Sequence, residues 1–345
     1  MTDSVRVVRD ASLRERNTFG VEAVAPWLVE LADASRLPDV LQRPELRAGL
    51  ALVLGGGSNL LFAGNPAGAV LALTGRKTQV LADGETAIVR ADAGVPWHDF
   101  VMHSLSMGLC GLENLALIPG TVGAAPIQNI GAYGVEVREF VHAVEAFEPG
   151  TGTLHRFSAT ECGFAYRDSV FKHAPDRYLV TAVEFALPRT PALRLDYAGI
   201  AEELATMRVT EPTPARVADA VIAIRRRKLP DPAVLGNAGS FFKNPIVPVI
   251  LADALKARYD SLPMFRGNSE DTRKLSAAWL IDQCGWKGHR EGDAGVAASH
   301  ALVLVNHGHA TGAQLLDLAR RIAASVHERF QVDIEPEPRV IGATW

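Results

Sequence analysis

Cysteine is scarce in this chain of 345 residues. The three cysteines, Cys110, Cys162 and Cys284, lie far apart and form no C-x-x-C pair. An odd number of widely separated cysteines argues against a disulfide framework and against a zinc site. We therefore predict a reducing, cytoplasmic environment, no metal site, and cysteines that pack as small core residues.

Long apolar runs and a positive charge balance are also missing. No stretch approaches the roughly 18 apolar residues that a membrane-spanning helix needs. The first twenty residues carry charge throughout and lack the apolar segment of a secretory signal. The net charge is −4, and no basic stripe is interleaved with aromatic residues. Neither a membrane nor a nucleic acid is therefore an expected partner.

The composition that remains is that of a folded protein, with 48% hydrophobic and 21% charged residues. A chain of 345 residues exceeds the usual size of one hydrophobic core, so two or three structural units are expected. Short apolar runs bounded by Gly, Pro, Asn or Asp alternate with helical patterns, which predicts a mixed α and β class. The expected strands are residues 50–54, 70–73, 86–91, 141–147, 178–187 and 301–306.

Three helices are readable from a period of 3.6 residues. One begins at Pro96, a residue suited to the first turn, and a second has an apolar stripe over residues 217–224. The third lies near the C-terminus and begins with Thr311 and Gln314, which have the spacing of a capping box. We interpret the apolar stripe of this third helix as core packing.

The first expected strand runs directly into Gly55-Gly56-Gly57-Ser58-Asn59-Leu60. Glycines occupy the first and third positions of G-x-G-x-x-G, but Leu60 stands at the sixth, so the dinucleotide fingerprint of a Rossmann fold is absent. Glycine also serves wherever the backbone needs a positive φ. The loop is therefore either a nucleotide-binding turn or a simple tight turn, and the pattern alone leaves both open.

A second glycine-rich segment, residues 117–134, is nearly free of bulky charged side chains. Small residues let a backbone approach a ligand closely, and main-chain N–H groups can then bind pyrophosphate. Gln128 and Asn129 add amide groups suited to the edge of a flavin ring. The alternative is a buried packing loop.

Six ordered motifs span nearly the whole chain. They are Asn17-Thr18-Phe19, Gly55-Gly56-Gly57-Ser58-Asn59-Leu60, residues 118–134, Tyr166-Arg167-Asp168-Ser169, residues 236–245 and Glu335-Pro336-Glu337. With these motifs the chain resembles the UDP-N-acetylenolpyruvoylglucosamine reductases, flavoproteins that share the vanillyl-alcohol-oxidase FAD fold.

The resemblance implies an α+β fold. A two-subdomain FAD-binding domain of the vanillyl-alcohol-oxidase/PCMH type is expected over residues 1–67, with 329–345 returning to it, and 68–205. A C-terminal α+β substrate-binding domain is expected over residues 210–328, with the active site forming where the domains meet.

The resemblance also implies an activity, the NADPH-dependent reduction of UDP-N-acetylglucosamine enolpyruvate to UDP-N-acetylmuramate in cytoplasmic peptidoglycan precursor synthesis. FAD is expected to be non-covalent, because the glycine segments offer no histidine or cysteine for a covalent link. NADPH and the substrate would bind in turn to one pocket of a monomer. Two alternatives stay open: a flavin oxidase or dehydrogenase of the same fold acting on a sugar or alcohol, and a non-catalytic flavin sensor.

The resemblance assigns catalytic roles to three residues. Ser240 would protonate C2 after hydride reaches C3, although without its motif it would read as a turn residue. Arg167 would hold the substrate carboxylate, and its alternative is an ordinary surface pair with Asp168. Glu337 would be protonated, or would orient Arg167 or a water, and the sequence leaves these open.

The remaining expected contacts are with substrate and cofactor. Substrate contacts are expected at Tyr197, Lys228, Asn244 and His300, with Lys243 beside them. Aromatic packing is the alternative for Tyr197, and a solvated helix end is the alternative for Lys228. FAD contacts are expected at Gly55, Gly56, Gly57, Ser58, Asn59, Leu60, Pro119, Gly120, Thr121, Gly123, Ala124, Gln128, Asn129, Gly131, Ala132 and Tyr133.

Overall fold

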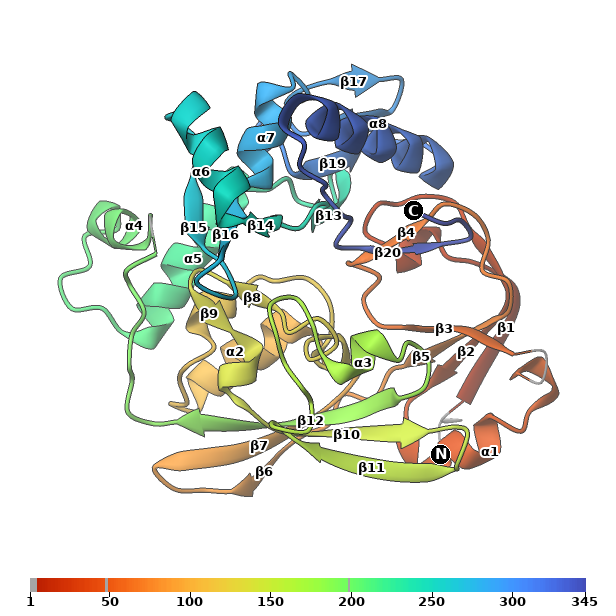
Figure 1. Cartoon of the computed structure of the whole chain (residues 1–345). Coiled ribbons are helices and arrows are strands. Elements are labelled where there is room, and N and C mark those ends of the chain that lie inside the picture. Colours follow the sequence, from red (N-terminus) through yellow and green to blue (C-terminus); the bar gives the residue numbers. More distant parts are fainter. Residues whose placement is uncertain (1–4, 47–48, 198) are drawn as a thin grey trace. The chain divides into compact units, whose positions relative to one another are not determined.

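The computed structural model describes residues 5–46, 49–197 and 199–345 (Figure 1). The chain divides into two compact units, each built from separate stretches of sequence. Unit 1 takes the described residues of Met1–Ala11, Ala25–Gly56 and Pro66–Arg227, and unit 2 takes those of Ser12–Val24, Gly57–Asn65 and Lys228–Trp345. The compact units part after Arg227. The three-domain division expected from the family stays a prediction.

The described residues form both helices and strands, so the structure confirms the predicted mixed class. The helices are α1 Leu37–Val40, α2 Trp97–Ser106, α3 Val170–His173, α4 Ile200–Thr206, α5 Pro214–Lys228, α6 Val249–Arg258, α7 Ala277–Gln283 and α8 Gly312–Phe330. The strands are β1 Val5–Ser12, β2 Val24–Leu31, β3 Leu50–Leu54, β4 Leu60–Phe62, β5 Ala69–Leu73, β6 Thr78–Ala82, β7 Thr86–Asp92, β8 Gly131–Ala132, β9 Val135–Glu136, β10 Val141–Glu148, β11 Thr153–Ser158, β12 Leu179–Pro188, β13 Gly236–Ser240, β14 Ile246–Pro248, β15 Met264–Arg266, β16 Thr272–Leu275, β17 Arg290–Glu291, β18 Ala294–Val296, β19 Val303–Asn306 and β20 Arg339–Ile341.

Unit 1 contains a four-stranded sheet in the order β1-β2-β5-β3. The inner strand β5 is buried at every position, and it pairs in parallel with β2 and with β3. A continuous apolar run is what a strand in a covered parallel sheet needs, which is why this run could be predicted. Strand β3 ends at Leu54, so the first glycine loop begins at the end of this strand.

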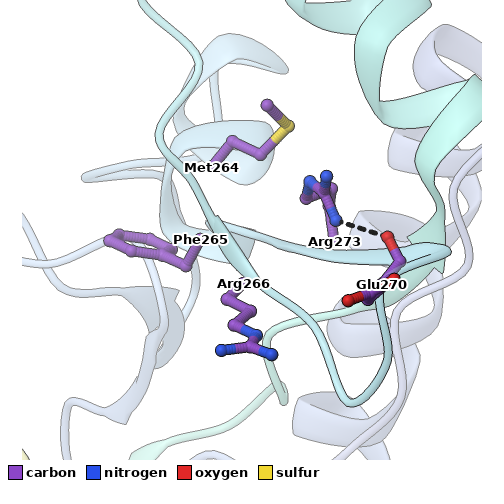
Figure 2. A pocket seen from close by; sticks show the side chains of 5 residues that line it. All are labelled: Met264, Phe265, Arg266, Glu270 and Arg273. Carbon is purple, nitrogen blue, oxygen red and sulfur yellow. Dashed lines mark hydrogen bonds between the residues drawn. The ribbon is translucent and has the colours of Figure 1, made fainter.

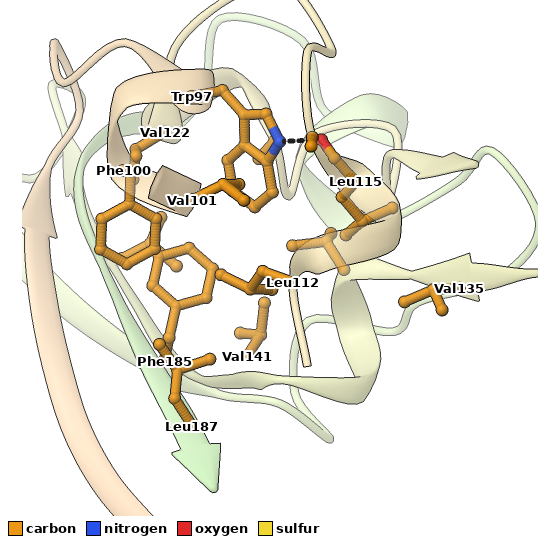
Figure 3. Close-up of a cluster of buried hydrophobic side chains, with 14 of the residues drawn as sticks. Trp97, Phe100, Val101, Leu112, Leu115, Val122, Val135, Val141, Phe185 and Leu187 are labelled. Carbon is orange, nitrogen blue, oxygen red and sulfur yellow. Dashed lines mark hydrogen bonds between the residues drawn. The ribbon is translucent and has the colours of Figure 1, made fainter. Parts of the chain in front are cut away.

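The second sheet of unit 1 is antiparallel, in the order β11-β10-β12-β7-β6. One face is covered by the core in Figure 3, where the rings of Trp97 and Phe100 pack against Phe185. The indole Nε1 of Trp97 donates a hydrogen bond of 2.9 Å to the carbonyl of Leu115. That bond satisfies the polar atom of a buried aromatic side chain and fixes the chain just before the second glycine segment.

The opposite face of this antiparallel sheet carries paired charges, because neighbouring side chains of a strand point to opposite faces. Arg90 bonds both carboxylate oxygens of Glu145 at 2.8 Å, and Arg156 bonds Glu184 at 2.6 and 2.8 Å. Hydrogen bonding to Glu145 raises the pKa of Arg90 despite the opposing effect of burial. These two bidentate arginine–glutamate pairs join β7 to β10 and β11 to β12, and so help to hold the four strands in register.

Unit 2 has a four-stranded sheet in the order β13-β19-β18-β17, with α8 packed on β18 and β19 and α7 packed on α8. A three-stranded antiparallel sheet, β14-β16-β15, contacts α6. Strand β20 pairs in parallel with β4, with Val340 opposite Leu61. Unit 2 is therefore completed by segments from both ends of the chain.

The elements expected from periodicity are present within a few residues of their predicted limits. Helix α8 begins with the predicted capping box, in which Thr311 Oγ1 accepts from the Gln314 N–H at 3.2 Å. The Thr311 N–H donates to Gln314 Oε1 at 2.9 Å. Strands of two or three residues, such as β14, β15, β17 and β18, were not predicted because they are too short for an alternating pattern to stand out.

Candidate functional site

The two glycine-rich segments meet inside unit 1. A Cβ built on Gly56 would lie 2.8 Å from the Cα of Gly120, and one built on Gly55 would lie 2.7 Å from Thr121 Oγ1. A Cβ on Gly123 would lie 2.5 Å from the Cβ of Ala93. The backbones therefore pack at distances that only glycine permits, while Gly55 and Gly56 stay exposed. Such a cradle of main-chain groups fits a pyrophosphate.

The first glycine loop continues into unit 2 at Gly57. Gly57 has a φ of +62°, and a Cβ there would lie 1.9 Å from the carbonyl oxygen of Arg16. The N–H of Thr18 donates to the Gly57 carbonyl at 3.2 Å, and the Thr18 carbonyl accepts from Asn237 N–H at 2.9 Å. The motif around Thr18 thus joins the glycine loop to strand β13.

The Thr18 side chain yields a stability prediction. Among the described residues its buried hydroxyl Oγ1 has no hydrogen-bond partner. Because burying an unsatisfied hydroxyl is unfavourable, Thr18→Val is expected to raise the free energy of unfolding by about 1 kcal/mol. Chemical denaturation of the two full-length proteins measures the difference. Thr18→Ser, which keeps the hydroxyl and removes the methyl group, should be less stable than wild type, and a less stable Thr18→Val protein would contradict the prediction.

Asn129 lies in the second glycine segment and is fully buried. Its Nδ2 donates to the Ala165 carbonyl at 2.9 Å and to Glu136 Oε2 at 3.0 Å, while its Oδ1 accepts from Arg138 N–H at 3.1 Å. These bonds connect the segment to the loop that carries Arg167. The expected contact of Asn129 with a flavin edge stays a prediction.

Arg167 lies in that loop and has a left-handed backbone with a φ of +54°. Its Nη2 donates to the Gly131 carbonyl at 2.8 Å, and its guanidinium lies 5.5 Å from the Tyr166 ring centroid. The carboxylate of Asp168 bonds the His173 ring at 2.6 Å. Arg167 is thus held against the second glycine segment rather than being only half of a surface pair with its neighbour.

Tyr197 lies beside the end of the same segment. It is 50% exposed, and its ring centroid is 5.3 Å from that of Tyr133, in an edge-to-face contact. The buried amide of Asn114 donates to the carbonyls of Tyr133 and Arg194, both at 2.9 Å. Sequence reasoning missed Asn114, which fixes the two chain segments that carry the tyrosines. The half-exposed Tyr197 is not a core aromatic.

In unit 2, Ser240 ends strand β13, where it lies opposite Val303 of β19. The pairing is irregular between Asn237 and Ser240, and Gly239 takes a φ of +69°. The Asn237 side chain stabilises this bend, since its Oδ1 accepts from the Gly239 N–H at 2.9 Å. A bulge changes the direction of the side chains that follow it, so this irregularity sets the direction of Ser240.

Glu337 is brought to the same strand end. Its N–H donates to the Phe241 carbonyl at 2.7 Å, one residue after Ser240. Asn59, from the first glycine loop, donates from Nδ2 to the Glu337 carbonyl at 3.4 Å, and its own carbonyl accepts from the Arg339 N–H at 3.0 Å. Unit 2 therefore gathers Asn59, Ser240 and Glu337 from three distant stretches of sequence.

Lys228 and His300 also lie close together in unit 2. The Ser299 hydroxyl donates to the Lys228 carbonyl at 3.1 Å, and His300 Nδ1 accepts from the Leu302 N–H at 3.2 Å. Burial, followed by the charges of Lys228 and Lys287, lowers the pKa of His300. The ring is therefore neutral at pH 7, beside an exposed ammonium group suited to an anion.

The two neighbouring polar residues of the Ser240 motif have structural partners. Asn244 Oδ1 accepts from the Ala277 N–H at 3.0 Å, at the start of α7. Lys243 Nζ lies 3.3 Å from Glu335 Oε2. Asn244 thus helps to begin a helix, and its expected substrate contact stays a prediction.

An open hollow of about 530 Å³ lies on the β15–β16 hairpin of unit 2 (Figure 2). It is lined by Met264, Phe265, Arg266, Glu270 and Arg273, and Arg273 Nη1 donates to the Glu270 carbonyl at 2.8 Å. This lining contains no residue with an expected role, and we assign no chemistry to it.

Three further features bear on the kind of protein. No helix of the described chain has the length and apolar character to cross a membrane. Within residues 5–46, 49–197 and 199–345, no group of three His, Cys, Asp or Glu side chains is arranged to hold a metal ion. Burial raises the pKa of Cys162 to about 12, so this thiol stays protonated. Cys110 is also buried, whereas Cys284 is half-buried.

Comparisons with known proteins cover almost the whole chain. A family model of an FAD binding domain matches residues 28–158, and a model of the UDP-N-acetylenolpyruvoylglucosamine reductase C-terminal domain matches residues 231–341. The chain is 59% identical to the UDP-N-acetylenolpyruvoylglucosamine reductase of Xanthomonas euvesicatoria pv. vesicatoria (strain 85-10), with 100% of both chains covered. It is 58% identical to that of Xylella fastidiosa (strain M12), covering 97% of this chain and 96% of the relative.

A solved structure agrees with these relatives. The crystal structure of the UDP-N-acetylenolpyruvylglucosamine reductase from Thermus caldophilus matches with a TM-score of 0.67 and 28% identity. The match covers 97% of this chain and 98% of that one.

Proposed function

The chain belongs to the UDP-N-acetylenolpyruvoylglucosamine reductases, and from this membership we propose that it reduces UDP-N-acetylglucosamine enolpyruvate to UDP-N-acetylmuramate with NADPH as the reductant. It is an FAD-dependent oxidoreductase of peptidoglycan precursor synthesis. We further propose that it acts as a monomer in the cytoplasm, with FAD held non-covalently.

The contact between the glycine segments carries the proposal for FAD. Gly55 and Gly56 pack against Gly120 and Thr121 with no room for a Cβ, which leaves backbone rather than side chains to meet a ligand. Main-chain N–H groups in such loops suit the pyrophosphate of FAD. The first loop continues through Ser58 and Asn59 and the second through Gln128 to Tyr133, so these residues would complete the cofactor site.

When bound, reduced FAD would supply the hydride for C3 of the enolpyruvyl group, and NADPH would supply the electrons that reduce the flavin. Arg167 would bind the carboxylate of that group, since its planar guanidinium offers two parallel donors. Its fixed charge would also favour the negative charge that grows towards the carboxylate as C2 becomes electron-rich.

Ser240 would then donate its hydroxyl proton to C2, which completes the addition of one hydride and one proton across the double bond. The irregular pairing before Ser240 and the positive φ of Gly239 support this role, because they set the backbone that carries the hydroxyl. Glu337, held on the Phe241 carbonyl beside Ser240, would orient Arg167 or a water, or would act in its protonated form. Arg167 lies in unit 1, and Ser240 and Glu337 lie in unit 2.

The nucleotide part of the substrate is an anion, and we assign it to Lys228 and the residues around it in unit 2. Lys228 would pair with its diphosphate, with Asn244 and the neutral His300 as hydrogen-bonding neighbours. Tyr197, half-exposed beside Tyr133, would also contact the substrate. NADPH, another anionic nucleotide, would use the same groups in turn.

Anaerobic flavin absorbance tests the proposal. NADPH should bleach the flavin of the holoenzyme, and the colour should return only on addition of UDP-N-acetylglucosamine enolpyruvate. An oxidase or dehydrogenase of the same fold would instead recover its colour rapidly in oxygen and ignore the enolpyruvyl nucleotide. A flavin that NADPH leaves coloured would overturn the proposed function.

A further inference from the structure

Leu117, the first residue of the second glycine segment, has a left-handed backbone with a φ of +58°. Left-handed geometry brings the Cβ of an L-residue too close to the following carbonyl, at a cost of roughly 1–2 kcal/mol. Such a conformation persists only where the surroundings determine it, and strained residues gather at functional sites. Two side chains hold Leu117 in this conformation.

One of them is His98 of helix α2, which lies 19 residues earlier in the chain. Its Nδ1 accepts a hydrogen bond of 3.1 Å from the Leu117 N–H. Burial lowers the pKa of His98, with smaller contributions in the same direction from Arg226 and Arg225 and an opposing one from Asp99. The ring is therefore neutral at pH 7, and Nδ1 remains an acceptor.

The other is Arg225 of helix α5, whose Nε donates to the Leu117 carbonyl at 3.2 Å. Arg225 follows Val221 by four residues and Ala218 by seven, so it continues the buried stripe of the helix. Arg225 begins the basic run Arg225-Arg226-Arg227-Lys228, and its helical spacing from Val221 places it on the inner face.

Arg225 also reaches the far end of the same segment. Its guanidinium lies near the hydroxyl of Tyr133, a second residue with a left-handed backbone at a φ of +50°, and its charge opposes the rise that burial causes in the pKa of that hydroxyl. Burial raises the pKa of the Tyr133 hydroxyl, which therefore stays protonated. One planar side chain thus bonds one strained end of the segment that contains Gly120 and Gly123 and lies near the other.

We propose that Arg225, together with His98, is a positioning residue that fixes the curvature of the 117–134 segment and thereby prepares it to bind FAD. The inference rests on the proposed assignment of this segment to FAD. Arg225 acts through backbone and through Tyr133, so its effect is on cofactor affinity and on the environment of the bound flavin. A lysine cannot replace it, because an ammonium group lacks the directed Nε–H that bonds the Leu117 carbonyl while the rest of the guanidinium lies near Tyr133.

The test compares full-length variants by their Kd for FAD, measured from flavin fluorescence, and by the visible circular dichroism of the bound flavin. Arg225→Met should raise the Kd about 10-fold or more, the equivalent of losing one hydrogen bond to a charged group. Arg225→Lys should bind FAD more weakly than wild type and show altered flavin dichroism. Arg226→Met, which removes the same charge from the next and exposed position of α5, should change the Kd by less than about twofold.

Two further variants separate this role from general stabilisation. His98→Asn keeps an acceptor near the position of Nδ1 and should retain FAD affinity, whereas His98→Leu should lose it. Glycine adopts a positive φ freely, so Leu117→Gly should reduce the effect of Arg225→Met on the Kd severalfold. An equal effect of Arg225→Met with and without Leu117→Gly would show that Arg225 does not act through the left-handed residue.

The outcomes distinguish this inference from the proposed function. A wild-type enzyme that turns over NADPH and the enolpyruvyl nucleotide, with an unchanged FAD affinity in Arg225→Met, overturns the inference alone. A wild-type enzyme that fails that cycle overturns the proposed function, while the FAD affinities still decide the role of Arg225. Unchanged affinity in both Arg225→Met and Gly56→Ala would show that the segment itself is not part of the FAD site.

Discussion

Ser240→Ala is expected to slow the recovery of flavin colour on addition of the enolpyruvyl nucleotide by about 100-fold or more, the usual effect of losing a general acid. The preceding reduction by NADPH should keep nearly its wild-type rate, because no proton is transferred to C2 in that step. Stopped-flow absorbance of the holoenzyme, with the two steps followed separately, measures both rates. The bulge at Gly239 sets the backbone of residue 240 independently of the hydroxyl. Ser240→Ala should therefore remove the hydroxyl without moving the backbone.

The matched control is Ser269→Ala, an exposed serine of the same unit that should leave both rates unchanged. Equal slowing of the two steps in Ser240→Ala would point to a disturbed flavin site instead of a missing proton donor. An unchanged second step would remove Ser240 from the mechanism and leave the proton at C2 to another group.

Gly56→Ala is expected to weaken cofactor binding strongly. A Cβ at this position would lie 2.8 Å from the Cα of Gly120, and a backbone atom cannot rotate away as a side chain can. Separating the two loops should cost about 1–3 kcal/mol, which corresponds to a rise in the Kd for FAD of up to about 100-fold. Fluorescence titration with FAD measures this change. Thermal unfolding shows how much of the loss of FAD affinity comes from destabilisation of the whole protein.

Gly150→Ala provides the matched control for Gly56→Ala. A Cβ on Gly150 meets no atom within 4 Å, and the residue lies in the same unit. This variant should bind FAD like the wild type. If Gly56→Ala binds equally well, the packing of the two loops has no part in holding the cofactor.

Residue patterns predicted the parts of the fold that depend on continuous periodicity. The buried strand β5 and the apolar stripe of α5 were evident because each repeats over several residues. Short strands such as β17 and β18 form through pairing with neighbouring strands. Their two or three residues are too few for a sequence pattern to predict them. The contribution of Ser12–Val24 and Gly57–Asn65 to unit 2 was not predicted for the same reason, since these stretches lie far in sequence from the segment that begins at Lys228.

In the candidate site, residue types predicted some features, whereas others depend on contacts that only the tertiary structure makes. Glycines in the two loops indicated close backbone approach, and the structure places Gly56 against Gly120. The left-handed Leu117 could not be predicted, because leucine has no local preference for that conformation and adopts it through bonds to His98 and Arg225. Asn129 was expected to face a flavin, and its amide bonds three protein groups that only the tertiary structure brings to it.

The parallel pairing of β20 with β4 has a consequence for biosynthesis. Asn59, next to β4, and Glu337, just before β20, are 278 residues apart, so their contact waits until nearly the whole chain has been translated. A nascent chain can fold unit 1 progressively as it leaves the ribosome. Strand β4, however, cannot pair with β20 until β20 has been synthesised. Contacts of such high sequence separation form slowly, which makes the closing of unit 2 the expected late step of maturation. Pulse-labelled chains should therefore become resistant to protease in unit 1 before they do so in unit 2.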